Sequence, residues 1–260
     1  MEKQYLILFS ATGRTKRVAD ILTTALGGTW TTIDLGTPDA ALPSVSIDRD
    51  DLCLAAVPVF EGRVPTPAVH RLMQLQGNGA SAILAAVYGN RAVDDCLLEL
   101  RDIMSGQGFA CRGAIAAVAE HSIFPKFGHA RPDTEDETQL KAFAADIKVG
   151  LEVGTLPALV KVPGNDPYKD MGGISVHPAA DDSCVQCGIC ASRCPVGAIP
   201  KDQPGTTDGT KCVTCMRCAT VCPQGARHFP AAIYSQVEQA MAPVLSGRKE
   251  NVLYLEEAPK

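Results

Sequence analysis

The sequence predicts an α/β fold with a doubly wound parallel sheet, followed by a small cysteine-rich domain. Two observations predict this arrangement. Apolar segments of strand length alternate with helical patterns over roughly the first 150 of the 260 residues, and eight of the eleven cysteines lie between Cys184 and Cys222. Strands that alternate with helices are typical of a parallel sheet, because each crossover between parallel strands needs a long connection. The cysteines then mark a second domain of different composition.

Five strands are expected in the first part, in the following order. "YLILFS" (5–10) is an apolar strand that runs into the amphipathic "RTKRVADILTTAL", and "TWTTIDL" provides a short second strand. Three further apolar strands are expected over 52–60, 80–89 and 111–120, with helices at "PAVHRLMQL", "AVDDCLLELRDIM" and "TEDETQLKAFAADIKVGL". Such sheets bind ligands beyond the carboxyl ends of their strands, so the loops after the strands are the candidate site.

Composition and charge exclude several classes of protein. The formal net charge is −5 and the Lys and Arg residues form no stripe, which argues against a nucleic-acid partner. No apolar run approaches the roughly 18 residues of a membrane span. The N-terminal "MEKQYLILFS" is interpreted as a first strand rather than a signal peptide, so a cytoplasmic location is expected. In that compartment a cysteine cluster is more often a metal site than a set of disulfides.

The cysteine-rich segment contains the same pattern twice. "CVQCGICASRCPVGAI" and "CVTCMRCATVCPQGAR" both read C-x2-C-x2-C-x3-C-P. In this bacterial iron–sulfur pattern, three cysteines hold one [4Fe–4S] cluster and the fourth ligates the other. The pattern therefore assigns the first cluster to Cys184, Cys187, Cys190 and Cys222, and the second to Cys212, Cys215, Cys218 and Cys194. Two zinc sites are the alternative, although zinc-binding cysteines usually form two C-x2-C pairs.

The loop after the first strand indicates a phosphate site. In "SATGRT", hydroxyls come from Ser10, Thr12 and Thr15, positive charge from Arg14, and close backbone approach from Gly13. At a helix N-terminus these groups can hold a phosphate. The loop is neither a P-loop nor a G-x-G-x-x-G turn, so the sequence does not favour ATP or a dinucleotide as its ligand. A turn that merely caps the helix is an equally good reading of these residues alone.

Two further loops favour a flavin site over a simple helix cap. "PVFEGRVP" (58–65) follows the third strand and "VYGNRAVDD" (87–95) follows the fourth. Each has an aromatic residue, Phe60 or Tyr88, near a glycine that would let the backbone approach a flat ring. Core packing explains either aromatic residue alone. Three such loops at one switch point of the sheet indicate a flavin.

Taken together, "FSATGRT", "VPVFEGRVP", "VYGNRAVDD", "AEHSIF", "ARPD" and "PGNDPYK" resemble the flavodoxin–ferredoxin fusion proteins of anaerobic bacteria and archaea. The resemblance implies a flavodoxin-like FMN domain (1–152) with strand order 2-1-3-4-5, a linker (153–175), a small α+β two-cluster ferredoxin domain (176–230) and a C-terminal helix and tail (231–260). It implies that FMN is bound by Ser10, Thr12, Gly13, Arg14, Thr15, Pro58, Val59, Phe60, Glu61, Gly62, Arg63, Tyr88, Gly89, Asn90 and Arg91. Glu61 stands where the family usually has glycine.

The expected function is intracellular electron transfer in anaerobic metabolism, between FMN, two [4Fe–4S] clusters and a redox protein with a basic docking surface. A flavin-dependent reductase of a small molecule, fed by the clusters, is the alternative. The oligomeric state is left open, a homodimer included, and no catalytic residue is assigned. His121 is expected to be structural, with a proton donor to reduced flavin as the alternative, and Cys53, Cys96 and Cys111 are expected to be buried thiols. Arg217, and Arg227 where the first pattern has Ile199, distinguish the second pattern by charge, and Arg217 is expected to raise the potential of the second cluster. An exposed Arg217 that helps to dock an acidic partner is the alternative.

Overall fold

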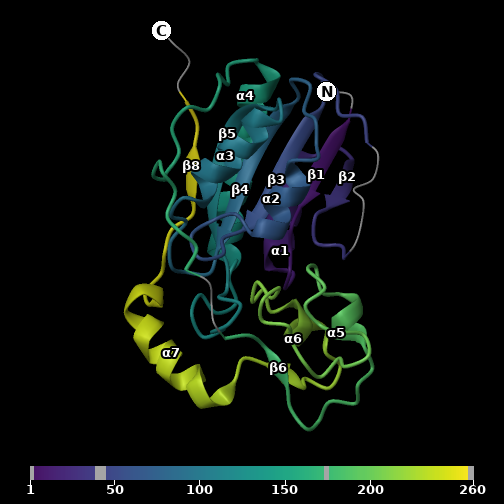
Figure 1. Cartoon of the computed structure of the whole chain (residues 1–260). Helices are drawn as coiled ribbons and strands as arrows, with labels where there is room; N and C mark the ends of the chain where they lie inside the picture. Colours follow the sequence, from purple (N-terminus) through teal and green to yellow (C-terminus); the bar gives the residue numbers. More distant parts are fainter. Residues whose placement is uncertain (1–2, 39–44, 173–175, 257–260) are drawn as a thin grey trace.

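A six-stranded sheet forms the larger part of the molecule (Figure 1). The computed structural model describes residues 3–38, 45–172 and 176–256. The sheet order is β2-β1-β3-β4-β5-β8. Its parallel strands are β1 (Gln4–Leu8), β2 (Trp30–Asp34), β3 (Leu52–Pro58), β4 (Ser81–Tyr88) and β5 (Ala110–Val118). The order 2-1-3-4-5 expected for these strands is therefore confirmed.

Four helices cover the two faces of the sheet. They are α1 (Arg14–Leu26), α2 (Thr66–Leu72), α3 (Cys96–Gly106) and α4 (Thr134–Glu152). One core cluster packs α1 and α4 against one face, and the other packs α2 and α3 against the opposite face. β3 and β4 are buried almost throughout, which explains why their sequences are continuous apolar runs. Among the described residues, no helix combines the length and apolar character needed to cross a membrane.

The cysteine-rich segment folds into a small body at one end of the sheet (Figure 1). It contains α5 (Ile189–Ser192), α6 (Arg217–Val221) and an antiparallel pair of strands, β6 (Ala179–Ala180) and β7 (Arg227–His228). The two cysteine patterns adopt the same backbone. Left-handed φ angles recur at the paired positions Gln186 and Thr214, Gly188 and Met216, and Gly197 and Gly225. The sequence repeat is therefore also a structural repeat.

The C-terminal tail returns to the sheet domain. Its helix α7 (Ala231–Leu245) covers the residues predicted to be helical, and Tyr234 and Leu245 pack on Phe124 and Phe127 of the loop after β5. The strand β8 (Val252–Tyr254), which the sequence did not predict, then pairs antiparallel with β5. Three residues in a charged tail give no strand pattern, so only the packing against β5 explains β8.

The segment between α4 and β6 lies along α3. Asp95 accepts hydrogen bonds from the backbone N–H of Asn165 (2.9 Å) and of Lys169 (2.7 Å). The hydroxyl of Tyr168 donates to Asp102 at 2.5 Å. Polar contacts therefore fix the course of this segment over the sheet domain.

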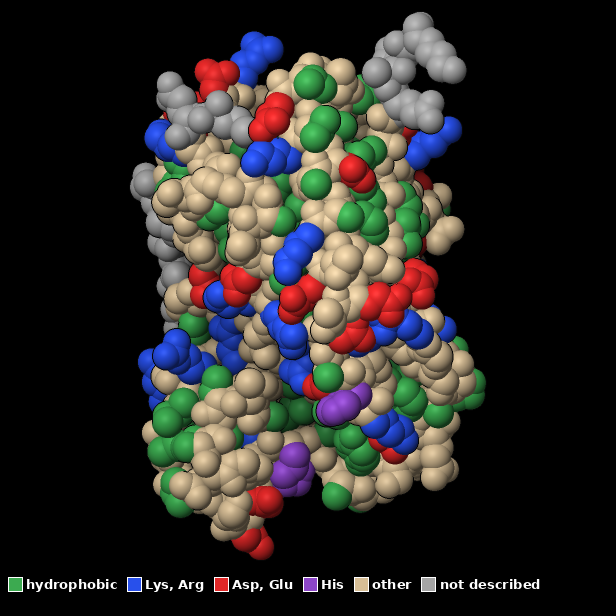
Figure 2. All heavy atoms as spheres, turned by 180° about the vertical axis from the view of Figure 1, so that it is seen from behind, with side chains coloured by type: hydrophobic (Ala, Val, Ile, Leu, Met, Phe, Trp, Pro, Cys, Tyr) green, Lys and Arg blue, Asp and Glu red, His purple; other side chains and the backbone are tan. Residues whose placement is uncertain are grey.

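On the face drawn in Figure 2, charged side chains of both signs gather in a band at mid-height.

Candidate functional site

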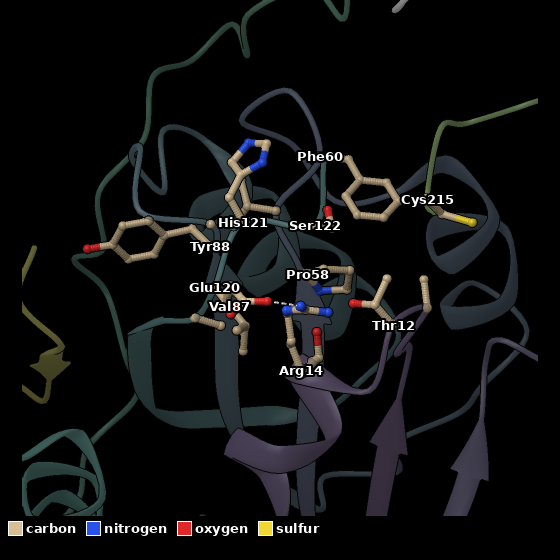
Figure 3. Close-up of a pocket in the computed structure, with 15 residues that line it drawn as sticks. Thr12, Arg14, Pro58, Phe60, Val87, Tyr88, Glu120, His121, Ser122 and Cys215 are labelled. Carbon is tan, nitrogen blue, oxygen red and sulfur yellow. Dashed lines mark hydrogen bonds and ion pairs between the residues drawn. The ribbon is translucent and has the colours of Figure 1, made fainter. Parts of the chain in front are cut away.

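A cavity of about 470 Å³ opens at the carboxyl ends of the parallel strands (Figure 3). It is lined by the loops after β1, β3, β4 and β5 and by one residue of the cysteine-rich domain, Cys215. The lining residues of the first three loops are Ala11, Thr12, Arg14, Thr15, Pro58, Val59, Phe60, Val87, Tyr88 and Gly89. Three loops that the sequence singled out therefore converge on one cavity.

The start of α1 fits a bound phosphate. The residue before the helix, Gly13, has a left-handed φ of 86° and provides no side-chain cap for the free N–H groups. A Cβ atom built on Gly13 would meet nothing within 4 Å, so the space above the turn is open. Ser10 Oγ accepts the backbone N–H of Lys16 at 3.1 Å, which places one hydroxyl at the helix start. Open space and free donors at a helix N-terminus suit an anion.

Arg14 is directed across the cavity towards Glu120, and the two side chains form an ion pair (Figure 3). Burial raises the pKa of Glu120, but the N–H of Ala130 and the Arg14 guanidinium outweigh it and hold that pKa below its ordinary value. The Arg14 charge is therefore already matched by a carboxylate. Glu120 is the last residue of the fifth predicted strand, and no pattern in the sequence marked it as a site residue.

The loop after β3 forms a tight turn at the edge of the cavity. Phe60 and Arg63 pair across it, and Phe60 contacts Phe9 edge to face at a centroid distance of 6.3 Å. Glu61 has a φ of 54°, in the left-handed region that favours glycine. This explains why glycine is usual at the position of Glu61 in the family that the sequence resembles.

Several side chains expected at a flavin ring have other partners. Arg63 forms an ion pair with Glu99 at 2.8 Å, and the amide of the buried Asn90 donates to the carbonyls of Leu245 and Gly247 at the end of α7. The Tyr88 hydroxyl donates to the carbonyl of Glu250 at 3.0 Å and points away from the cavity (Figure 3). Arg63 also donates to the carbonyl of Lys169, so these side chains anchor the linker and the tail, while Tyr88 and Gly89 still line the cavity.

A second, more apolar cavity of about 820 Å³ adjoins the first. The two share four lining residues, Val59, Tyr88, Gly89 and His121. The second cavity is also lined by Glu61, Gly62, Arg91, Ala92, Ile123, Phe124, Phe229, Val237 and Met241. Residues from both predicted ring loops thus face a hydrophobic space, of which α7 forms one wall.

His121 lies between the two cavities as a neutral side chain. Its Nδ1 accepts the backbone N–H groups of Ile123 (3.2 Å) and Phe124 (3.1 Å), and its ring stacks on Phe124. Burial, with the nearby charges of Arg14 and Arg91, lowers the pKa of His121 to about 4. Since Nδ1 accepts two hydrogen bonds, the single proton sits on Nε2. The hydrogen bonds to Nδ1 fix the orientation of the ring, and Nε2–H is left as one N–H donor.

The eight cysteines of the repeat line two separate cavities. One, of about 320 Å³, is lined by Cys184, Cys187, Cys190 and Cys222. The other, of about 330 Å³, is lined by Cys194, Cys212, Cys215 and Cys218. We refer to these as the first and second cluster cavities. Each contains three cysteines of one pattern and the fourth cysteine of the other, which is the grouping that the spacing predicted.

The donors around these cysteines fit thiolate ligands. The backbone N–H of Ala198 donates to Cys194 Sγ at 3.2 Å, and that of Thr214 donates to Cys212 Sγ at 3.4 Å. Among the described residues, no three His, Cys, Asp or Glu side chains are grouped to hold one metal ion. A cubane does not need such a group, because each of its irons takes one thiolate. The other three cysteines are buried, and burial raises the pKa of Cys53 to about 12.

Two arginines cross the boundary between the domains. Arg217, at the start of α6, donates to the backbone carbonyls of Ser10, Ala11 and Gly36. In the opposite direction, Arg71 of α2 donates to the carbonyl of Pro195 at 3.0 Å. Carbonyl acceptors leave no pattern in the sequence, which is why neither contact was expected. These bonds hold the second cluster cavity against the loop after β1.

Comparison with known proteins separates the two parts of the chain. The family model "4Fe-4S dicluster domain" matches residues 183–226. No curated protein matches the chain. Similar solved structures include a rubredoxin:oxygen oxidoreductase from Desulfovibrio gigas, at 14% identity and a TM-score of 0.42 over 59% of this chain and 37% of that one. The match thus spans little more than a third of the oxidoreductase.

Flavodoxins also appear among the similar structures. A Streptococcus pneumonia flavodoxin matches at 17% identity and a TM-score of 0.40, over 56% of this chain and 97% of its own. Megasphaera elsdenii flavodoxin matches at 15% identity and a TM-score of 0.38, over 55% of this chain and 98% of its own. The fold assignment rests on the strand order itself. The chain therefore joins a flavodoxin-like sheet to a 4Fe-4S dicluster segment, the two parts that the sequence resemblance implies.

Proposed function

We propose that this chain, a flavodoxin-like sheet joined to a 4Fe-4S dicluster segment, is an electron-transfer protein that carries FMN and two [4Fe–4S] clusters. One observation carries the proposal: Cys215 lines both the cavity at the strand ends and the second cluster cavity. Bound FMN would exchange electrons in pairs or singly, and the clusters singly. A residue shared by both cavities is what such a protein needs, because it keeps the two kinds of cofactor close together.

The residues at the strand ends suit FMN. The backbone N–H groups after Gly13 and the hydroxyls of Thr12 and Thr15 would hold the phosphate, while the loops at Pro58–Phe60 and Tyr88–Gly89 would face the ring. His121 Nε2–H would donate a hydrogen bond there as a neutral imidazole. Arg14, paired with Glu120, adds little net charge. Backbone dipoles rather than side-chain cations would then stabilise the phosphate.

The exit for electrons is proposed at the first cluster cavity. Cys187 is exposed, and the apolar residues two positions before and after it, Val185 (64% exposed) and Ile189 (40%), are exposed as well. This is the part of either cluster cavity that a partner protein reaches most directly. Because the chain is acidic and thiolate-bound clusters add negative charge, a partner with a basic surface fits best. We propose a cytoplasmic protein of anaerobic metabolism.

A second function has one observation in its favour. The apolar cavity beside the ring loops has the lining of a small-molecule site. Its wall formed by Val237 and Met241 of α7 lies outside the flavodoxin-like sheet. A flavin-dependent reductase, fed by its own clusters, would use such a cavity for a hydrophobic substrate.

Anaerobic re-oxidation decides between the two functions. The purified protein is first analysed for about eight iron, about eight sulfide and one FMN, which two complete cysteine sets and one phosphate site require. It is then reduced chemically and mixed either with small-molecule oxidants or with a basic electron-carrier protein. The proposal expects fast re-oxidation by the carrier, slowed by salt. Fast turnover with a small molecule alone, slowed by Met241→Trp, would establish the reductase instead.

A further inference from the structure

The cysteine-rich domain contains a buried cation without an anionic partner. Arg227, in β7, is only 2% exposed. Its two terminal nitrogens donate to neutral acceptors, the carbonyls of Pro178, Pro204 and Thr206 and the hydroxyl of Thr207. In the described part of the chain it forms no ion pair. A buried charge is costly unless an opposite charge is near, so an anion belongs beside Arg227.

The position of Arg227 identifies that anion. Its side chain lines the first cluster cavity together with Cys184, Cys187, Cys190 and Cys222. One of its acceptors, Pro204, lines the same cavity, whereas two others, Pro178 and Thr207, line the second. The guanidinium therefore forms part of the wall between the two cavities. A cluster bound by four thiolates is the anion that this wall would face.

The third nitrogen of the guanidinium provides the specific contact. Nε of Arg227 is buried, and no described atom accepts its proton. Buried donors in proteins nearly always have a partner. In a side chain that lines the first cluster cavity, the remaining acceptors for this N–H are a cysteine thiolate or a sulfide of the cluster.

The second cluster cavity is different at the equivalent position. The repeat pairs Arg227 with Ile199, which is 4% exposed and lines the second cavity. Arg217 lines that cavity as well, but it is only partly buried and all three of its nitrogens donate to carbonyls of the sheet domain. Its charge is therefore directed towards the interface. Arg227 therefore lines only the first of the two cavities, and its charge also acts on Cys212 and Cys218 at the second. What distinguishes the first cavity is the unpartnered Nε–H of Arg227.

We infer that Arg227 is a positioning residue that raises the reduction potential of the first cluster above that of the second. This inference rests on the two clusters of the proposed function. Reduction adds one negative charge to a cluster, and a buried guanidinium with an N–H to sulfur stabilises that state more than the oxidised one. The sequence suggested the opposite order, because both Arg217 and Arg227 follow cysteines of the second pattern.

A redox titration monitored by EPR tests the inference on the anaerobic, cofactor-loaded full chain. The variant Cys194→Ser, which changes a ligand of the second cluster only, assigns the two signals. In the unmodified chain, the signal of the first cluster should appear at the higher potential. In Arg227→Met, the ratio of reduced to oxidised first cluster at a fixed potential should fall at least tenfold. A tenfold fall corresponds to a reduction potential lowered by 59 mV for one electron. The matched control Ile199→Met should leave both potentials in place.

A second measurement on the native protein remains decisive if Arg227→Met loses iron. With arginine labelled by ¹⁵N, pulsed EPR of the reduced protein should detect a nitrogen coupling on the signal of the first cluster. Arg227→Lys, which retains the charge but not the Nε–H, should abolish this coupling. A higher potential for the second cluster, or no coupling at the first, overturns the inference while the proposed function stands. Absence of iron–sulfur clusters from the anaerobic protein overturns both.

Discussion

The guanidinium of Arg217 lies 2.5 Å from the backbone carbonyl oxygen of Ser10, a residue 207 positions earlier in the chain. Ser10 begins the loop that would hold the phosphate, and Arg217 lies between two cysteines of the second pattern. One side chain therefore connects the two candidate cofactor sites. Hydrogen bonds from a charged donor contribute about 1.5–3 kcal/mol each. This makes Arg217 the principal described contact through which the two sites are held together.

Replacing Arg217 should loosen the interface without removing cofactors. In Arg217→Met, backbone N–H groups of the loop after β1 should exchange with solvent more readily, by about 2 kcal/mol in opening free energy. Hydrogen exchange followed by mass spectrometry measures this on the loaded full chain. Arg193→Met, an exposed arginine of the same domain, is the matched control. Identical exchange in the two variants would show that Arg217 does not hold the domains.

Cross-ligation predicts a selective cluster loss. Cys194→Ala removes a ligand from the cavity lined by Cys212, Cys215 and Cys218. About four of about eight irons should be lost or labile, and the EPR signal of the other cluster should persist. Cys53→Ala, which removes a buried thiol far from both patterns, should keep all the iron. Damage confined to the cluster of Cys184 would reverse the assignment.

Gly13→Val should abolish FMN binding and leave both clusters intact. Gly13 has a φ of 86°, and a branched residue in that left-handed region is strained by about 1–2 kcal/mol. The side chain would also enter the open space above the helix start. Flavin content and EPR measure the two effects separately. Gly106→Val, at the end of α3, fills open space without a left-handed φ and should keep its flavin.

The stability of the protein should depend on pH through His121. Its pKa is lowered from 6.5 to about 4 in the folded chain, so its contribution is complete above pH 6.5 and is lost as the pH falls towards 4. By pH 5 the loss is about 2 kcal/mol, or several degrees in Tm. His121→Asn lacks this titration, so its Tm should fall less between pH 7.5 and pH 5. If Tm fell equally with pH in the two proteins, the assignment of a buried neutral imidazole would be contradicted.

The parts that the sequence predicted are those with local signals. Continuous apolar runs marked β3 and β4, because strands buried on both faces need no polar residues. The cysteine spacing predicted the two groups that line the cluster cavities, because the ligand order of this repeat is fixed by its backbone. The sequence did not predict the directions of side chains. An aromatic residue at a strand end can face either way, and the hydroxyl of Tyr88 donates to the tail while Tyr88 still lines the cavity.

Long-range polar contacts could not be predicted from the sequence. Arg217 and Arg227 occur ten residues apart, yet one donates to carbonyls of the sheet domain and the other is enclosed between the cluster cavities. Their acceptors are mostly backbone carbonyls, which every residue carries. Only the folded chain shows which carbonyls come within reach. The same reason explains why β8 and the role of Asn90 were not anticipated.

The return of the chain to form β8 makes the cysteine-rich domain an insertion rather than an appendage. The chain keeps contact with the sheet domain up to Lys169, passes through the cysteine-rich domain, and supplies a sixth strand to the same sheet only at Val252. The inserted domain is therefore tethered at both ends, which limits its range of motion and raises its effective concentration at the strand ends. After one proteolytic cut between residues 153 and 175, the contacts of α7 and β8 would still hold it to the sheet domain. A fragment ending at Glu152 would likewise lack a strand of its own sheet.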